Sequence, residues 1–122
     1  IDSIIGEIFD AVSRLGVRRV VVDSIGDLLI STNHFQRLHG YLYALSQHFA
    51  VRGVTSIFIH EITTQPQQLE SRISALADNI IHLNVELDGK VRRTVRIVKA
   101  RGVEHEMDSK DLRITKAGVQ VS

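Results

Sequence analysis

The chain contains no cysteine and no tryptophan, and proline and methionine occur once each. Without cysteine it has neither disulfides nor thiolate metal sites, a composition that is compatible with a reducing cytoplasm. No apolar run approaches the ~18 residues that would span a bilayer, and no secretory signal is evident, so we expect no membrane partner. An excess of one charge is also absent, with 15 Lys and Arg against 14 Asp and Glu, so net charge does not predict a polyanionic partner.

The composition that remains is that of an ordinary globular protein. A chain of 122 residues is long enough for one domain with a real core. Its contents of 43% hydrophobic and 24% charged residues are typical of a soluble globular protein. The single methionine is Met107, so residue 1 is not an initiator methionine. The first residues already have the pattern of the middle of a fold. We therefore expect residues 1–122 to form one structural unit that belongs to a longer polypeptide.

The first elements alternate between helix and strand periodicity. Apolar residues within 1–15 recur on one face of a helix, which Gly16 ends. The stretch "RRVVVDS", 18–24, follows as a strand whose three consecutive valines predict burial on both faces. This pattern favours a parallel, helix-covered sheet.

The same alternation continues in the next forty residues. Residues 31–33 offer a helix cap, and the apolar spacing over 35–49 predicts an amphipathic helix that Gly53 ends. A second buried strand is expected at 54–61. Helix, strand, helix, strand in this order indicates an α/β layer fold with right-handed crossovers.

The C-terminal part changes to strand periodicity. Pro66 lies in a loop and is expected to begin a short helix. Apolar and polar residues then alternate over 81–87, and Asp88-Gly89 predicts a tight hairpin turn into a returning strand at 90–102. Residues 111–121 predict one more small hairpin.

Four stretches occur in an order that is typical of one family: "VVVDS", "ADNIIHL", "VRRTVRIVKARGVEH" and "LRITKAGV". The most specific of these features is K-x-R-G-x-x-H after a D-N-I-I strand and a hairpin. Together they resemble the KaiC-type circadian-clock ATPases, a branch of the RecA superfamily. The resemblance extends over 1–122 and corresponds to the C-terminal part of one ATPase domain, from the helix before Walker B to the domain's end.

The resemblance implies a fold and an assembly. The fold is a partial RecA-like (P-loop NTPase) α/β fold, with a mostly parallel sheet flanked by helices and a C-terminal antiparallel hairpin. The family assembles into hexameric rings that bind ATP and Mg²⁺ between neighbouring subunits. A ring-type homo-oligomer is therefore the expected partner in the full-length protein, and the 122-residue chain is itself a candidate to dimerise through an open sheet edge.

The resemblance also assigns roles within one subunit. Asp23 resembles the Walker B acid, which holds Mg²⁺ through water, and Ser24 is its neighbour at the nucleotide. Mg²⁺ prefers carboxylate and water oxygens, and strand carboxyl ends in open α/β sheets face the ligand crevice. The family's Thr-Thr-Glu after the second strand is Ile59-His60-Glu61 here, so only Glu61 matches as a catalytic acid.

Three further residues resemble those that one subunit extends to the next. Lys99 and Arg101 match the residues that reach the neighbour's γ-phosphate, and His105 matches a histidine of that loop, where it is a candidate to bond a phosphate or the base. Lys99 and Arg101 share strand parity, and Gly102 lets the backbone turn. In the final turn, this chain has Lys116 at the position where the family commonly has an acid.

The phosphate-binding loop itself is missing. A Walker A motif needs G-x-x-x-x-G-K-[ST], because its backbone N–H groups cradle phosphates. The only Gly-Lys pair is Gly89-Lys90, which Val91 follows in a hairpin turn. The family's paired catalytic glutamates would precede residue 1. We therefore do not expect the chain to hydrolyse ATP alone.

Plainer interpretations of the same residues stay open. Asp23 is also placed to cap the turn before Ile25, and Lys99 and Arg101 to form a solvated basic strand end. The basic run "KVRRTVR" is typical of nucleic-acid binding in recombinases, but equally of a charged edge strand that resists aggregation, and no aromatic residue interleaves with it. The six histidines lack metal-ligand spacing. A non-catalytic, RecA-derived signalling or oligomerisation module is the alternative to an ATPase.

Overall fold

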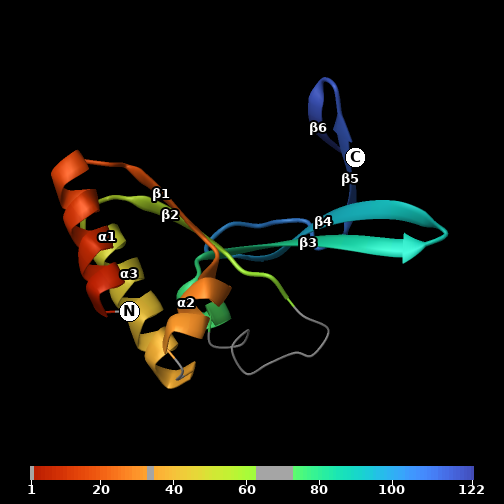
Figure 1. Cartoon of the computed structure of the whole chain (residues 1–122). Coiled ribbons are helices and arrows are strands. Elements are labelled where there is room, and N and C mark those ends of the chain that lie inside the picture. Colours follow the sequence, from red (N-terminus) through yellow and green to blue (C-terminus); the bar gives the residue numbers. More distant parts are fainter. Residues whose placement is uncertain (1, 33–34, 63–72) are drawn as a thin grey trace. The chain divides into compact units, whose positions relative to one another are not determined.

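The computed structural model describes residues 2–32, 35–62 and 73–122, and the chain divides into two compact units. Unit 1 comprises 1–76 and unit 2 comprises 77–122. Unit 1 contains helices and a parallel strand pair, whereas unit 2 consists of antiparallel strands (Figure 1). That both units belong to one domain stays a prediction.

Unit 1 is built on two adjacent parallel strands. Strand β1 (Arg19–Asp23) pairs with β2 (Thr55–Ile59), and Asp23 is the register partner of Ile59. Helices α1 (Asp2–Leu15), α2 (Ile25–Thr32) and α3 (Phe35–Val51) precede or connect them. The parallel pairing confirms the predicted β–α–β connection.

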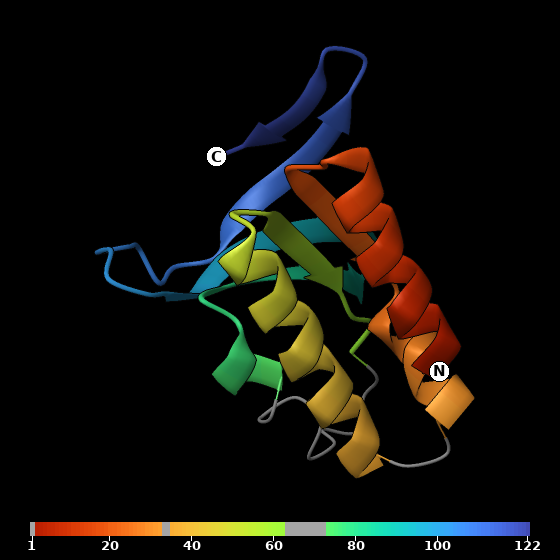
Figure 2. The same cartoon turned by 90° about the vertical axis from the view of Figure 1, so that its left-hand side faces the viewer.

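The helices bury one face of this strand pair. Helices α1 and α3 lie on the same side of β1 and β2 (Figure 2), where Phe49 is fully buried. Val20 and Val22 are half-buried against the two apolar clusters, but Val21 between them is 59% exposed. The prediction that this strand is buried on both faces is therefore wrong for the structure, because the helices of unit 1 pack on one side only. The buried core of unit 1 consists of Ile5, Val12, Ile25, Leu28, Leu38, Leu42, Leu45, Phe49 and Val54.

The helix ends agree with the sequence in two places and differ in one. Gly16 and Gly53 adopt φ values of 58° and 65°, left-handed conformations that glycine accepts without strain, and they end α1 and α3 as predicted. Of the predicted cap at 31–33, residues 31–32 form the end of α2, a helix that the sequence had not indicated, and residue 33 lies outside the described residues. The short helix expected to begin at Pro66 falls largely outside the described residues, although 73–76 are helical.

Unit 2 is a four-stranded antiparallel sheet with the order β3-β4-β5-β6. Its strands are β3 (Asn79–Asp88), β4 (Lys90–Ala100), β5 (Lys110–Thr115) and β6 (Gly118–Val121). Gly89, with φ 69°, forms the predicted hairpin turn, and the small C-terminal hairpin is confirmed. A mostly parallel sheet is not what the described residues contain, since four of their six strands pair only antiparallel.

The sheet of unit 2 has one apolar and one polar face. Opposed residues of antiparallel strands share a face, so the register sorts the side chains. We call the apolar face the set Ile81, Leu83, Val85, Leu87, Val91, Val95, Ile97, Leu112, Ile114, Val119 and Val121. Arg93 and Lys110 are the charged residues that the register places among them. The opposite, polar face includes His82, Asn84, Glu86, Arg92, Thr94, Arg96, Asp111 and Arg113.

Candidate functional site

Asp23 is the last residue of β1, at the carboxyl edge of the parallel pair. It is exposed, and the Asp23–Ser24 peptide bond is cis. Within the described residues no hydrogen bond or ion pair engages its carboxylate, whereas the Ser24 hydroxyl donates to Asp27 Oδ2 at 3.1 Å in the first turn of α2. The start of this helix is thus supported by Ser24 and Asp27, which weakens the interpretation of Asp23 as a mere cap.

Glu61 lies two residues beyond β2 and is exposed. Because β1 and β2 are parallel and Asp23 pairs with Ile59, the ends of both strands reach the same edge of the sheet. Carboxyl ends of neighbouring parallel strands are where ligands bind in open α/β sheets. The structure therefore brings Asp23 and Glu61 to one edge of the strand pair, whereas their roles as catalytic acids stay predictions.

A β-bulge decides where Lys99 and Arg101 lie. Ile81 pairs with Ile97, but Ile80 pairs with Lys99, so Val98 is an extra residue in β4. Without the bulge, strand period would place Lys99 on the apolar face with Ile97. With it, Lys99 lies opposite Ile80 on the polar face. The bulge precedes both basic residues, so their shared parity is kept. Lys99 is half-buried and engaged, and Arg101 is exposed.

Arg101 is held at the open end of the β3–β4 hairpin. Its Nη1 lies 2.8 Å from Asp78 Oδ1, and its backbone N–H donates to the Asp78 carbonyl at 2.9 Å. Sequence reasoning missed this carboxylate, because only the strand register shows that residues 78 and 101 face each other.

His105 lies in the loop between β4 and β5, and its ring contacts the backbone of the same loop. Its Nδ1 is 3.3 Å from the Val103 carbonyl, and its Nε2 is buried with no hydrogen-bond partner within the described residues. Nearby, Lys110 Nζ lies 2.8 Å from Glu106 Oε2. Contact between His105 and a nucleotide stays a prediction.

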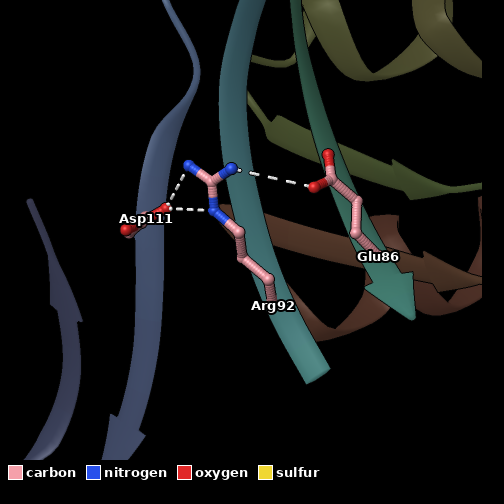
Figure 3. A network of polar contacts seen from close by, with 3 residues as sticks. All are labelled: Glu86, Arg92 and Asp111. Atoms are coloured by element: carbon pink, nitrogen blue, oxygen red, sulfur yellow. Dashed lines mark hydrogen bonds and ion pairs between the residues drawn. The ribbon is translucent and has the colours of Figure 1, made fainter. Parts of the chain in front are cut away.

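The basic hairpin is partly neutralised by its own acids (Figure 3). Arg92 donates from Nε to Asp111 Oδ1 at 2.8 Å, its Nη2 is 2.8 Å from the same oxygen, and its Nη1 is 3.8 Å from Glu86 Oε2. The pKa of Arg92 is raised, first by the hydrogen bond to Asp111 and then by the Asp111 and Glu86 charges. Lys90 is the backbone register partner of Asp88 across the turn. This arrangement favours a structural role over nucleic-acid binding.

Metal-ligand clusters and membrane-spanning helices were also sought in the described part of the chain. Within 2–32, 35–62 and 73–122, no group of three His, Cys, Asp or Glu residues is placed to hold a metal ion by itself. Among the helices of those ranges, none is both long and apolar enough to cross a membrane.

The geometry and the motifs agree with a comparison against known families. The family model "ATPase: KaiC" matches residues 1–122, and the chain belongs to this family of KaiC-type, RecA-superfamily ATPase domains. A KaiC-like protein of Pyrococcus horikoshii has the same fold, with a TM-score of 0.82 and 23% identity over 99% of this chain and 56% of its own.

The curated relatives are consistent with this assignment. A UPF0273 protein of Pyrococcus furiosus is 31% identical over 113 residues, which are 91% of this chain and 45% of the relative. The circadian clock protein KaiC3 of Synechocystis is 30% identical over 108 residues, 85% of this chain and 21% of the relative. The chain thus spans about half the length of the UPF0273 proteins that it matches.

Proposed function

We propose that residues 1–122 supply part of an ATP-hydrolysing site in a full-length KaiC-type protein. Asp23 acts within its own subunit as the Walker B acid, and Lys99 and Arg101 act on the nucleotide of the next subunit. The observation that carries the proposal is the exposed Asp23 carboxylate, which no other described residue engages, at the end of a parallel strand in a chain of this family.

The residues at this edge fit a magnesium ion. Mg²⁺ keeps several waters and is usually bound by one or two carboxylates together with substrate phosphates. Asp23 would hold it, and Glu61 at the neighbouring strand end would orient the attacking water as a general base. When bound there, the ion would neutralise negative charge on the phosphates. Ser24, already bonded to Asp27, would approach the nucleotide from the start of α2.

Positive charge from a neighbour completes the site. Phosphoryl transfer spreads negative charge over the γ-phosphate oxygens, and an arginine supplied in trans is worth ~10³–10⁵ in rate. Lys99 and Arg101 share the polar face at the end of β4, and His105 follows in the next loop. This shared placement supports their action on one phosphate group.

Self-association has a surface to support it. Three large side chains of the apolar face, Ile81, Leu83 and Leu87, are 63%, 72% and 78% exposed. Apolar side chains that are exposed together on one face are typical of an interaction surface, whereas single exposed ones are not. A two-fold, face-to-face contact centred on Arg93 would oppose two like charges. A head-to-tail contact, which generates rings, presents a different surface to this face and avoids that repulsion. The apolar face is therefore a surface that the proposed ring contact could bury.

The test is the magnesium-dependent ATPase activity of the full-length protein. Asp23→Asn should lower steady-state turnover at least ~10²-fold at fixed Mg²⁺, because the carboxylate that neutralises the metal is lost. The matched control is Asp10→Asn, an exposed acid on α1, which should retain normal turnover.

The competing account is a non-catalytic, RecA-derived assembly module. It predicts no ATP turnover by the full-length protein and equal behaviour of Asp23→Asn and Asp10→Asn. Turnover that is unchanged by Asp23→Asn would also remove the Walker B assignment.

A further inference from the structure

The Lys99–Arg101 segment is followed by a loop, 102–109, whose two ends are each fixed by an arginine–aspartate pair. At the entrance, Arg101 bonds Asp78 through both its side chain and its backbone N–H. At the exit, Arg92 bonds Asp111 through two nitrogens (Figure 3). The strand ends that flank this loop are therefore held to β3 and β4 by ionic pairs in addition to the backbone ladder.

The entrance pair depends on the bulge at Val98. The bulge shifts β4 by one residue, so that Asn79 pairs with Ala100 and Arg101 comes opposite Asp78. Bulges next to functional sites commonly redirect a side chain. Here the shift removes Arg101 from the parity of the apolar face and provides it with a carboxylate.

We propose that Asp78 is a positioning residue for Arg101, a role that rests on the proposed function of Arg101 in trans. Asp78 engages Nη1 of the guanidinium, and no other partner of Arg101 lies within the described residues. A guanidinium carries five N–H donors in a rigid fork. One side of the fork is thus engaged by Asp78, and the remaining donors would be left to bind a phosphate.

The exposure of the pair suits this role better than a role in stability. The Arg101 and Asp78 side chains are 60% and 70% exposed, and exposed ion pairs contribute little to folding. What the pair changes is the range of directions that a long, flexible side chain samples. A catalytic group that is held near its working geometry lowers the barrier by more than the pair contributes to stability.

The decisive experiment is a double-mutant cycle on the ATPase activity of the full-length protein. Asp78→Asn should lower kcat about 10-fold with KM for ATP nearly unchanged, because an interaction made in the transition state is misaligned. Arg101→Ala should lower kcat ~10³-fold or more. In the Arg101→Ala background, Asp78→Asn should have no further effect, since the group that it positions is gone.

Two controls separate positioning from a general structural effect. Asp88→Asn removes a carboxylate at the other end of β3 and keeps the turn, since Asn-Gly suits it as well as Asp-Gly, so kcat should not change. Asp78→Glu keeps the charge and should restore at least half of the activity lost in Asp78→Asn. A structural role would lower the melting temperature of Asp78→Asn, which we expect to stay within about 1–2 °C of the wild type.

Each result has a distinct meaning. If Arg101→Ala leaves kcat unchanged, the proposed role of Arg101 in trans fails, and this inference fails with it. If Arg101→Ala abolishes turnover but Asp78→Asn does not lower kcat, only the positioning role of Asp78 is overturned. The same holds if Asp78→Asn lowers kcat equally with and without Arg101.

Discussion

At the scale of single residues, His48 shows how burial disfavours the charged form of a ring in the α1–α3 contact. Its ring stacks on Phe9 with centroids 3.9 Å apart, and its Nδ1 lies 3.0 Å from Arg52 Nη1. Its Nε2 is buried without a hydrogen-bond partner in the described part of the chain. The pKa of His48 is lowered, first by loss of hydration and then by the positive charge of Arg52.

This lowered pKa predicts a pH dependence of stability. The unfolded chain binds a proton at His48 near the ordinary pKa of about 6.5, whereas the folded chain does so only at lower pH. The stabilisation is complete above about pH 6.5 and is lost as the pH falls through that value to the folded pKa. His48→Phe keeps the stacked ring without the titration. Urea unfolding at pH 7.5 and 5.5 should therefore show a smaller loss on acidification for His48→Phe than for the wild type. Equal losses in both would contradict this account.

At the scale of elements, the strands of unit 2 sort their residues between an apolar and a polar face. Alternation places Leu83 on the apolar face and its neighbour Asn84 on the polar face of the same strand. Both are exposed in the single chain, with Leu83 at 72%. An exposed apolar face of this kind is typical of an interaction surface.

This sorting predicts which substitution affects assembly. In the full-length protein, Leu83→Ser should weaken self-association at least ~10-fold, because apolar area is lost from the contact. Asn84→Ser, its neighbour on the opposite face, should leave association unchanged. Analytical ultracentrifugation over a range of concentrations measures both. An Asn84→Ser effect as large as that of Leu83→Ser would show that the apolar face does not form the contact.

How far the sequence predicts the elements depends on which interaction decides each one. Apolar spacing predicted α1 and α3, and Asp88-Gly89 predicted the hairpin, because these signals are local. Helix α2 was missed since Ile25-Gly26 has the character of a turn and glycine disfavours helix, yet Ile25 is fully buried in the unit 1 core. Packing there outweighs propensity.

The features of the candidate site also differ in how far the sequence predicts them. Asp23 at a strand end and the shared parity of Lys99 and Arg101 follow from local periodicity and motif. The bulge at Val98 and the pairing of Asp78 with Arg101 depend on cross-strand register, which no run of residues in one strand specifies. The run of three valines misled because the consecutive pattern predicts two covered faces, and the described helices cover one.

At the scale of the whole molecule, the two units carry different parts of the proposed site. Unit 1 holds Asp23 and Glu61, and unit 2 holds Lys99, Arg101 and Asp78. In the proposed ring each ATP contacts unit 1 of one subunit and unit 2 of the next. In this proposed arrangement, Asp23 and Arg101 of one subunit act on two different ATP molecules.

Mixing two inactive full-length variants tests this claim most directly. Asp23→Asn and Arg101→Ala subunits are each expected to be inactive alone. In a ring assembled from equal amounts of both, about a quarter of the interfaces combine an intact Asp23 with an intact Arg101 from the neighbour, if mixing is random. The account predicts that ATP turnover reappears when the variants are dissociated, mixed and reassembled. Turnover of the mixed ring no higher than the sum of the separate variants would contradict it.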